Sequence, residues 1–212
     1  GMTKDIPVVI SAVTDPAESG LVADNAAPGG NVTGASDLTP VADQISLLKQ
    51  LIPDAKTVGV LYCSAESNSA IQAQMAKEAC EANGLEAVDF TVSSTNEIQT
   101  VVESMVGKVD AIYAPTDNTI ANGMATVAMI ANDNGLPVIC GESGMVESGG
   151  LATYGIDYSQ LGFMAGEMVV DILVNGTNPG DIPVGYLSAD KCEFAVNEET
   201  AAKLGIDVSS IQ

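Results

Sequence analysis

The stretch VGVLYCSAESNSAIQAQMAKEAC, residues 58–80, contains the pattern that decides the fold of this chain. An apolar run ends at Cys63, six small or polar residues follow, and apolar residues then recur at helical spacing at Ile71, Met75 and Ala79. The pattern predicts a buried strand that passes through a polar loop directly into an amphipathic helix.

The same succession of strand and helix recurs along the chain. The helical stretches before residues 85 and 136 both end in Asn-Gly, which supplies a left-handed cap before the next strand. Such alternation predicts an α/β fold, a three-layer doubly wound parallel sheet with right-handed crossovers. The apolar runs of strand length are 6–13, 57–62, 85–92, 109–115 and 136–140.

Residues 37–141 alone make a complete unit with four strands, whereas the rest of the chain does not. The remaining predicted elements are strands at 6–13 and 150–156, a helix at 158–174, extended segments at 183–188 and 193–196, and a helix from Asn197. A sheet of so few strands packed on two helices would leave apolar faces of this part of the chain uncovered.

Composition excludes several classes of function. The 212 residues include 7 basic and 28 acidic residues, a net charge of -21, so nucleic acid is not an expected partner. Histidine is absent, which excludes Ser-His-Asp and Cys-His hydrolase chemistry. The four cysteines lack C-x-x-C spacing and are expected to be buried small hydrophobic residues. No metal site is expected, and without a G-x-G-x-x-G or Walker loop no cofactor is expected either.

The chain is expected to be soluble. No apolar run approaches the ~20 residues that span a bilayer, and no signal peptide precedes the first strand. Gly1 and Met2 are interpreted as an expression scar followed by a start residue.

The strand ends predict where a ligand binds. If the four strands of 37–141 are ordered 2-1-3-4, strand order reverses between the first and third, and ligands bind beyond the carboxyl ends there. This order places the loops 63–68 and 115–118 side by side. The helix N-terminus after the first loop suits a carboxylate, and Asp117 offers an acceptor for an ammonium group. Together the loops would suit a zwitterion.

Ordinary helix capping is the alternative explanation for these polar residues. The pattern Ser69-x-x-Gln72 fits a capping box, and Asp117 is equally compatible with a solvated side chain. Ser94-x-x-Glu97, which follows the edge strand, is predicted to be a cap and no more, so Ser94→Ala is expected to cost about 1 kcal/mol of stability.

Several longer motifs resemble one family. They are VTDPAESGLVADNAAPGGNVTGASD (13–37), YCSAESNS (62–69), APTDNTIA (114–121), GLATYGIDYSQLGFMAG (150–166) and NEETAAKLGI (197–206). In this order they resemble bacterial ABC-transporter substrate-binding proteins with the type I periplasmic-binding-protein fold, in the group that carries aromatic amino acids. The resemblance implies two lobes joined by three crossings, with the ligand held between the lobes.

The resemblance also implies domain boundaries. Residues 1–30 and 146–190 would form a partial first lobe, 37–141 and 191–212 a complete second lobe, with crossings near 31–36, 141–145 and 190–193. Much of the first lobe would be missing, so its uncovered faces are expected to pair in a homodimer. Full-length members are extracytoplasmic, either periplasmic or anchored as lipoproteins.

The resemblance implies a non-enzymatic function, the solute-binding component of an ABC importer. The expected ligand is an amino acid, most plausibly tryptophan, phenylalanine or tyrosine, and the expected partner is an ABC permease. Ser64, Asn68 and Ser69 would contact the ligand carboxylate, and Thr116 and Asp117 its ammonium group. Contacts from the first lobe and the hinge side would come from Thr14, Asp15, Pro16, Glu142 and Asp157.

Three other functions stay open at this point. The chain could be a truncated domain without binding activity, or a receptor for a sugar or nucleoside, because type I lobes host many ligands. A distant alternative is a flavodoxin-like or phosphatase-like enzyme, for which Asp110 and Asp117 would have to share a magnesium ion.

Overall fold

The computed structural model describes residues 3–188, 191–209 and 211. The chain divides into two compact units, a smaller one of residues 1–38 and 156–192 and a larger one of residues 39–155 and 193–212. Each unit has its own sheet.

The larger unit is built on a six-stranded sheet with the order β4-β3-β5-β6-β7-β9. Its first four strands confirm the predicted order 2-1-3-4, and all pairs are parallel except β7 with β9, which is antiparallel. The sheet is therefore mixed, rather than parallel throughout as predicted. The strands are β3 (Thr57–Cys63), β4 (Glu86–Val92), β5 (Ala111–Ala114), β6 (Val138–Cys140), β7 (Ala152–Gly155) and β9 (Glu193–Val196).

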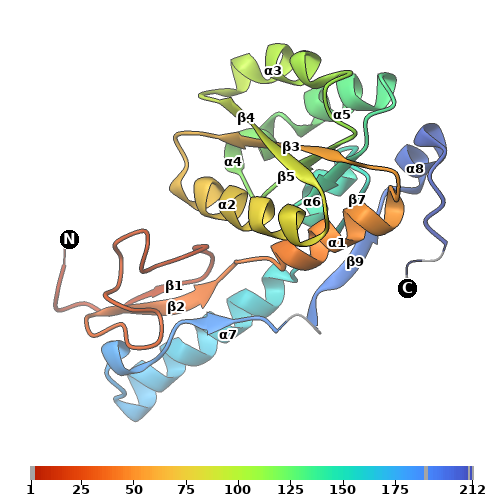
Figure 1. The fold of residues 1–212 in the computed structure, drawn as a ribbon. Coiled ribbons are helices and arrows are strands. Elements are labelled where there is room, and N and C mark those ends of the chain that lie inside the picture. Colours follow the sequence, from red (N-terminus) through yellow and green to blue (C-terminus); the bar gives the residue numbers. More distant parts are fainter. Residues whose placement is uncertain (1–2, 189–190, 210, 212) are drawn as a thin grey trace. The chain divides into compact units, whose positions relative to one another are not determined.

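Helices cover both faces of this sheet, which gives the predicted three layers (Figure 1). One face packs against α1 (Val41–Leu51) and α2 (Ser67–Ala82). The other packs against α3 (Ile98–Met105), α4 (Asn118–Asn122), α5 (Met124–Asp133) and α6 (Ser143–Glu147), with the short η1 (Thr95–Glu97) before α3.

Because both faces of the sheet are buried, its strands appear in the sequence as continuous apolar runs. Successive side chains of a strand point to opposite faces, so Val60 packs in one cluster and Leu61 in the other, and both are fully buried. Three of the four cysteines are buried free thiols, as expected, and Cys192 is partly exposed. Burial raises the pKa of the Cys80 thiol to about 11, so it stays protonated at neutral pH.

The Asn-Gly helix ends are confirmed as left-handed caps. Gly84 and Gly135 have φ values of 70° and 69°. A Cβ at Gly84 would meet nothing within 4 Å, so only backbone strain opposes a side chain there.

Replacing Gly84 or Gly135 by alanine should therefore lower the free energy of unfolding by the same amount. We expect Gly84→Ala and Gly135→Ala each to lower the free energy of unfolding by about 1 kcal/mol, measured by urea denaturation. Glu81→Ala, at an exposed position one turn earlier, is the control and should change stability by less than about 0.5 kcal/mol. Equal stability of the wild type and both glycine variants would contradict the strain argument.

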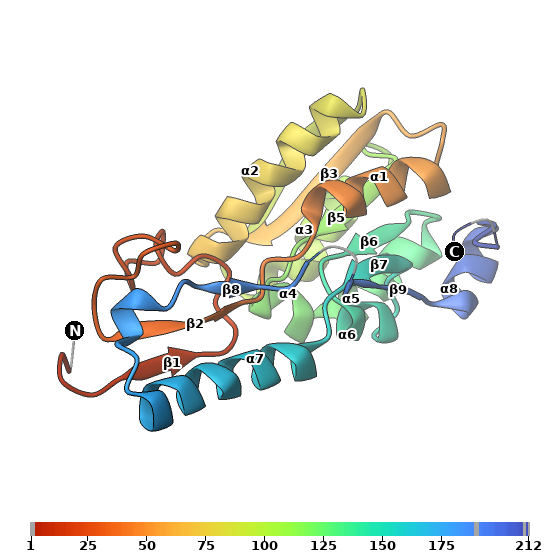
Figure 2. The same cartoon turned by 90° about the horizontal axis from the view of Figure 1, so that it is seen from below.

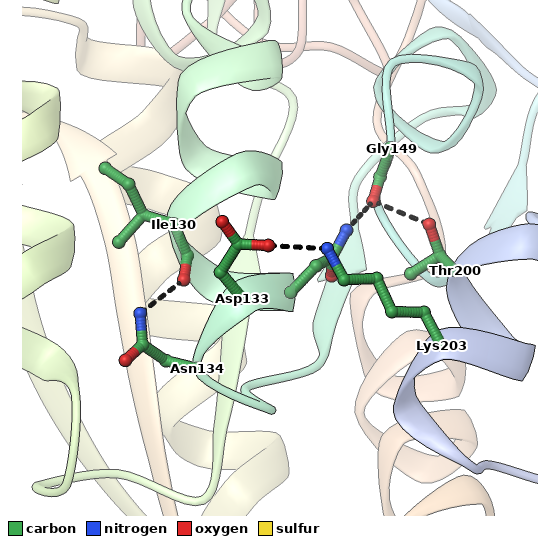
Figure 3. A network of polar contacts seen from close by, with 7 residues as sticks. Ile130, Asp133, Asn134, Gly149, Thr200 and Lys203 are labelled. Carbon is green, nitrogen blue, oxygen red and sulfur yellow. Dashed lines mark hydrogen bonds and ion pairs between the residues drawn. The ribbon is translucent and has the colours of Figure 1, made fainter.

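Polar contacts attach the C-terminal helix α8 (Glu198–Leu204) to the end of α5 and to the residues after α6 (Figure 3). Lys203 Nζ pairs with Asp133 Oδ1 at 2.6 Å, and the Thr200 hydroxyl donates to the Gly149 carbonyl at 3.1 Å. These contacts hold residues 197–204 on the larger unit, although they follow the smaller unit in the chain.

The smaller unit has three parallel strands in the order β1-β2-β8, with α7 packed along β1 and β2 (Figure 2). Ala35 of β2 packs with Ile156 and Leu161 in a small core. Gly34 has a φ of 145°, and a Cβ there would clash with the Ile10 backbone, so β1 and β2 approach closely only with glycine. The elements are β1 (Val8–Ile10), β2 (Val32–Ser36), α7 (Tyr158–Val170), the π-helical η2 (Asp171–Asn175), η3 (Pro179–Asp181) and β8 (Gly185–Tyr186).

The unit boundaries differ from the predicted lobes in three places. Residues 146–155 belong to the larger unit, because β7 pairs with β6 and β9. The predicted crossing 31–36 contains β2 (Val32–Ser36), and the division between the units follows at Leu38; the predicted crossing 141–145 lies within the larger unit and contains the start of α6 at Ser143. The third predicted crossing, 190–193, contains the division between Cys192 and Glu193, and its residue 190 lies outside the described residues, as do Gly1 and Met2.

Candidate functional site

The loop after β3 (64–66, the β3 loop) and the loop after β5 (115–117, the β5 loop) lie side by side in the larger unit. The topology predicted this, because β3 and β5 are neighbouring parallel strands that end at the same edge. Hydrogen bonds from the residues on either side of the β3 loop reach the β5 loop: the Cys63 N–H, at the end of β3, donates to Asp117 Oδ2 at 2.6 Å, and Asn68 Nδ2, in the first turn of α2, donates to the Thr116 carbonyl at 3.1 Å.

Asp117 is buried, with 2% of its surface exposed, and serves as the N-cap of α4. Its Oδ1 accepts from the Ile120 N–H at 2.8 Å, while Oδ2 holds the Cys63 N–H. The side chain is thus not solvated, and each of its two carboxylate oxygens accepts a backbone hydrogen bond. Each oxygen keeps a second lone pair with which to meet a ligand.

The predicted capping box Ser69-x-x-Gln72 is wrong. The helix α2 begins at Ser67, so Ser69 lies inside its first turn, fully buried. Gln72 reaches across to the β5 loop, where Nε2 and Oε1 lie 2.6 and 2.8 Å from the Thr116 hydroxyl and Oε1 accepts from the Thr116 N–H at 3.3 Å.

Ser94 occupies the N-cap position of η1, as predicted, but the predicted capping bond of its side chain is not formed. The Glu97 carboxylate instead accepts from the backbone N–H and the hydroxyl of Ser93, at 2.7 and 2.9 Å. Ser94→Ala should consequently have no capping contact to lose.

Glu66 lies in the site but was not among the predicted ligand contacts. Its carboxylate accepts four hydrogen bonds from the start of α4: from the backbone N–H and Nδ2 of Asn118 at 3.1 and 2.9 Å, and from the backbone N–H and hydroxyl of Thr119 at 2.9 and 2.8 Å. Burial alone would raise the pKa of Glu66, but the hydrogen bonds outweigh burial and lower it.

The N-terminus of α2 is left open as a consequence. Glu66 occupies its N-cap position, yet no side chain caps the helix. The first backbone hydrogen bond runs from the Ala70 N–H to the Glu66 carbonyl, and the N–H groups of 67–69 have no acceptor among the described residues. These N–H groups and the helix dipole make the position electropositive, and the exposed Ser64 lies in the loop before it. The arrangement can bind a small anion such as a carboxylate.

Glu142, which follows β6, is a further predicted site residue of the larger unit. Its carboxylate caps α6 by accepting from the N–H groups of Gly144 and Met145, both at 2.7 Å. The Gly141 backbone before it packs so closely on Pro115 and Thr116 that a Cβ would clash. The loop after β6 therefore supports the β5 loop from its other side.

Thr14, Asp15 and Asp157 lie in the smaller unit. Asp15 Oδ1 accepts from Asn25 Nδ2 at 2.8 Å, and Asp157 caps α7 by accepting from the Ser159 N–H at 2.7 Å. The six remaining predicted residues share the larger unit: Ser64, Asn68, Ser69, Thr116, Asp117 and Glu142.

The Thr14 hydroxyl is buried and donates to Asp37 Oδ1 at 3.0 Å. Burial raises the pKa of Asp37, against the opposing effect of this hydrogen bond. Sequence analysis did not single out Asp37, although it ends the motif 13–37 that carries the family resemblance.

Asp110 and Asp117 cannot share a metal ion, because Asp110 precedes β5 and Asp117 follows it, at opposite ends of the strand. Asp110 Oδ2 instead accepts from the N–H groups of Lys56 and Thr57. Within the described part of the chain, no three His, Cys, Asp or Glu side chains are grouped as metal ligands would be. In the same residues, no helix has the length and apolar character to cross a bilayer.

Fold and site together show an α/β sheet with two polar loops at a switch point of the strand order. The family described as ABC transporter substrate binding protein matches residues 1–211, and the chain belongs to that family. The resemblance and the α/β, periplasmic-binding-protein-like fold are thereby confirmed.

Three relatives add detail. A tyrosine-binding protein from Clostridioides difficile (strain R20291) is 44% identical over 202 residues, which make up 95% of this chain and 58% of that protein, so this chain spans less than two thirds of it. A solved ABC domain from Streptococcus pneumonia in complex with L-Trp is 44% identical with a TM-score of 0.91, covering 99% of this chain and 70% of that one. A ligand-free, open substrate-binding protein with adhesive properties from Clostridium difficile shares 44% identity and the same coverage at a TM-score of 0.79.

Proposed function

We propose that this chain is the ligand-binding part of an ABC importer and that it binds an aromatic amino acid without catalysis. The observation that carries the proposal is the 44% identity, over 99% of the chain, to a solved ABC domain that holds L-Trp. The 44% identity to a tyrosine-binding protein supports the same ligand class. Tryptophan, tyrosine and phenylalanine share an α-amino acid head group and differ only in the ring.

The head group fits the two loops of the larger unit. In the proposal the ligand carboxylate lies at the open N-terminus of α2 and is bound by the backbone there, Ser64, Asn68 and Ser69. The ammonium group lies toward Thr116 and Asp117, whose carboxylate keeps one lone pair on each oxygen. Thr14, Asp15, Glu142 and Asp157 complete the proposed set of ligand contacts.

Isothermal titration calorimetry tests the proposal. We expect saturable binding of at least one of L-tryptophan, L-tyrosine and L-phenylalanine, and affinity at least about tenfold lower for its methyl ester, which lacks the carboxylate charge. Ribose and adenosine are the controls for the sugar or nucleoside alternative and should give no heat of binding. Binding of ribose or adenosine, with none of an aromatic amino acid, would contradict the proposed ligand class.

The proposal includes the setting of the whole protein. The larger unit would be a complete second lobe and the smaller unit part of a first lobe, in an extracytoplasmic protein that delivers its ligand to an ABC permease. The homodimer stays a prediction. The homodimer prediction is supported by large apolar side chains of α7 and η2 that are 56–75% exposed: Phe163, Val170, Leu173 and Val174.

A further inference from the structure

We infer that Glu66 and Gln72 are positioning residues of the amino-acid site, which hold the β3 loop and the start of α2 against the β5 loop and the start of α4. The ligand in this inference is that of the proposed function. The contacts themselves lie wholly within the larger unit.

The Glu66 contact spans 52 residues of sequence. The Glu66 carboxylate accepts hydrogen bonds from the backbone N–H and Nδ2 of Asn118 and from the backbone N–H and hydroxyl of Thr119, all between 2.8 and 3.1 Å. Hydrogen bonds to an ionised acceptor are stronger than neutral ones, and the N-terminus of a helix favours the negative charge. Glu66 therefore fixes the direction in which α4 leaves the β5 loop.

The Gln72 contact spans 44 residues and is fully buried. The Thr116 hydroxyl lies within hydrogen-bond distance of both Nε2 and Oε1, so it can accept from the first and donate to the second. Oε1 also accepts the Thr116 N–H at 3.3 Å. The buried Gln72 amide therefore restricts the movement of the β5 loop. A displacement of the loop would leave the hydroxyl and the N–H of Thr116 buried without their hydrogen-bond partner.

The two residues flank the proposed ligand contacts on α2. Asn68 and Ser69 lie between Glu66 and Gln72 in the first turn and a half of the helix, and Thr116 and Asp117 are the β5-loop residues opposite. Both sides of the head-group site are thus held by contacts within the chain itself. Preorganised contacts bind more tightly because their ordering cost has already been met in folding.

The charge of Glu66 is partly offset by four donors of α4, to which its carboxylate is hydrogen-bonded. Its pKa is lowered from 4.5, so the ionised form is kept at pH 5 and above. Since the pKa is depressed in the folded chain, this contact contributes fully above pH 4.5 and is lost as the pH falls through the lower folded value.

Glu66→Gln is the test variant, with Glu97→Gln as the matched control. Glu97 is another glutamate of the larger unit whose carboxylate accepts from a backbone N–H and a hydroxyl. The first measurement is backbone amide hydrogen exchange by NMR in the ligand-free proteins. We expect exchange at Asn118 and Thr119 to be about tenfold faster in Glu66→Gln and unchanged in Glu97→Gln.

The second measurement is the affinity for the aromatic amino acid that binds best to the wild type. We expect Glu66→Gln to bind about tenfold more weakly with an unchanged binding stoichiometry, and Glu66→Gln combined with Thr119→Val to be no weaker than the single variant, because both remove the same contact. Wild-type affinity should fall more steeply than that of Glu66→Gln as the pH drops through the lowered pKa of Glu66. A purely structural glutamate would lower thermal stability without this affinity profile.

Gln72→Met keeps the length of the side chain and removes its amide, and should weaken binding by at least as much as Glu66→Gln. Exchange at Asn118 and Thr119 that stays at the wild-type rate in Glu66→Gln, or affinities that are unchanged, would overturn the inference. A wild-type chain that binds no aromatic amino acid, while Glu66→Gln still speeds exchange at Thr119, would overturn the proposed function and leave the contact between the loops standing.

Discussion

Asp117→Asn should lower the free energy of unfolding by about 2–4 kcal/mol. If Asp117 were only the counter-charge of an ammonium group, this substitution would keep the fold and weaken ligand binding. In the structure Asp117 is buried and each carboxylate oxygen accepts one backbone N–H, from Ile120 and from Cys63. An asparagine would set its NH2 group against one of these two donors, so a buried N–H would lose its acceptor.

Urea denaturation of the ligand-free protein measures this cost. The matched control is Asp133→Asn, which removes an aspartate from an exposed ion pair with Lys203 and should change stability by less than about 0.5 kcal/mol (Figure 3). Equal stability of Asp117→Asn and the control would show that the carboxylate is dispensable to the fold. In that case the counter-charge role alone would explain Asp117.

Gly141→Ala should be the second large effect, with a loss of about 2–3 kcal/mol. A Cβ at Gly141 would overlap the backbone of Pro115 and Thr116, which cannot rotate away as a side chain could. The substitution must push the β5 loop off its position, and Thr116 would then move away from the Gln72 amide. Ligand affinity should therefore fall together with stability.

Gly155→Ala is the control for Gly141→Ala within the same unit. A Cβ at Gly155 would have only ordinary van der Waals contacts, the nearest at 3.4 Å, so the cost should stay below about 1 kcal/mol. Thermal unfolding followed by circular dichroism compares the two variants. If Gly141→Ala were as stable as Gly155→Ala, the close packing of the loop after β6 on the β5 loop would be refuted.

Local sequence patterns were sufficient to predict the order of the four strands β3 to β6. Alternating strands and helices, with right-handed crossovers, leave few orders for β3 to β6, and the predicted one is confirmed. The strand β2 was missed because VTGAS (32–36) has no apolar run, and Gly34 serves the close approach to Ile10. The antiparallel pairing of β7 with β9 was missed because it joins residues about 40 apart, across the whole of α7 and η2.

The candidate site could be predicted only in its location. Neighbouring strands end at one edge of a sheet, so the meeting of the two polar loops followed from strand order. The partners of individual side chains did not follow, because Glu66 and Gln72 bond to residues 44 to 53 positions away. Local rules instead paired Ser69 with Gln72, since a capping box considers only neighbours three residues apart.

Native mass spectrometry of the freshly purified chain tests the proposed function most directly, because one spectrum reports the number of subunits and any bound ligand. The account predicts an added mass equal to one aromatic amino acid per subunit, either retained from the host or gained on adding tryptophan, tyrosine or phenylalanine. The accompanying subunit count decides between a monomer and the predicted homodimer. A folded chain that acquires none of the three amino acids would contradict the account and leave a family fold without the family's function.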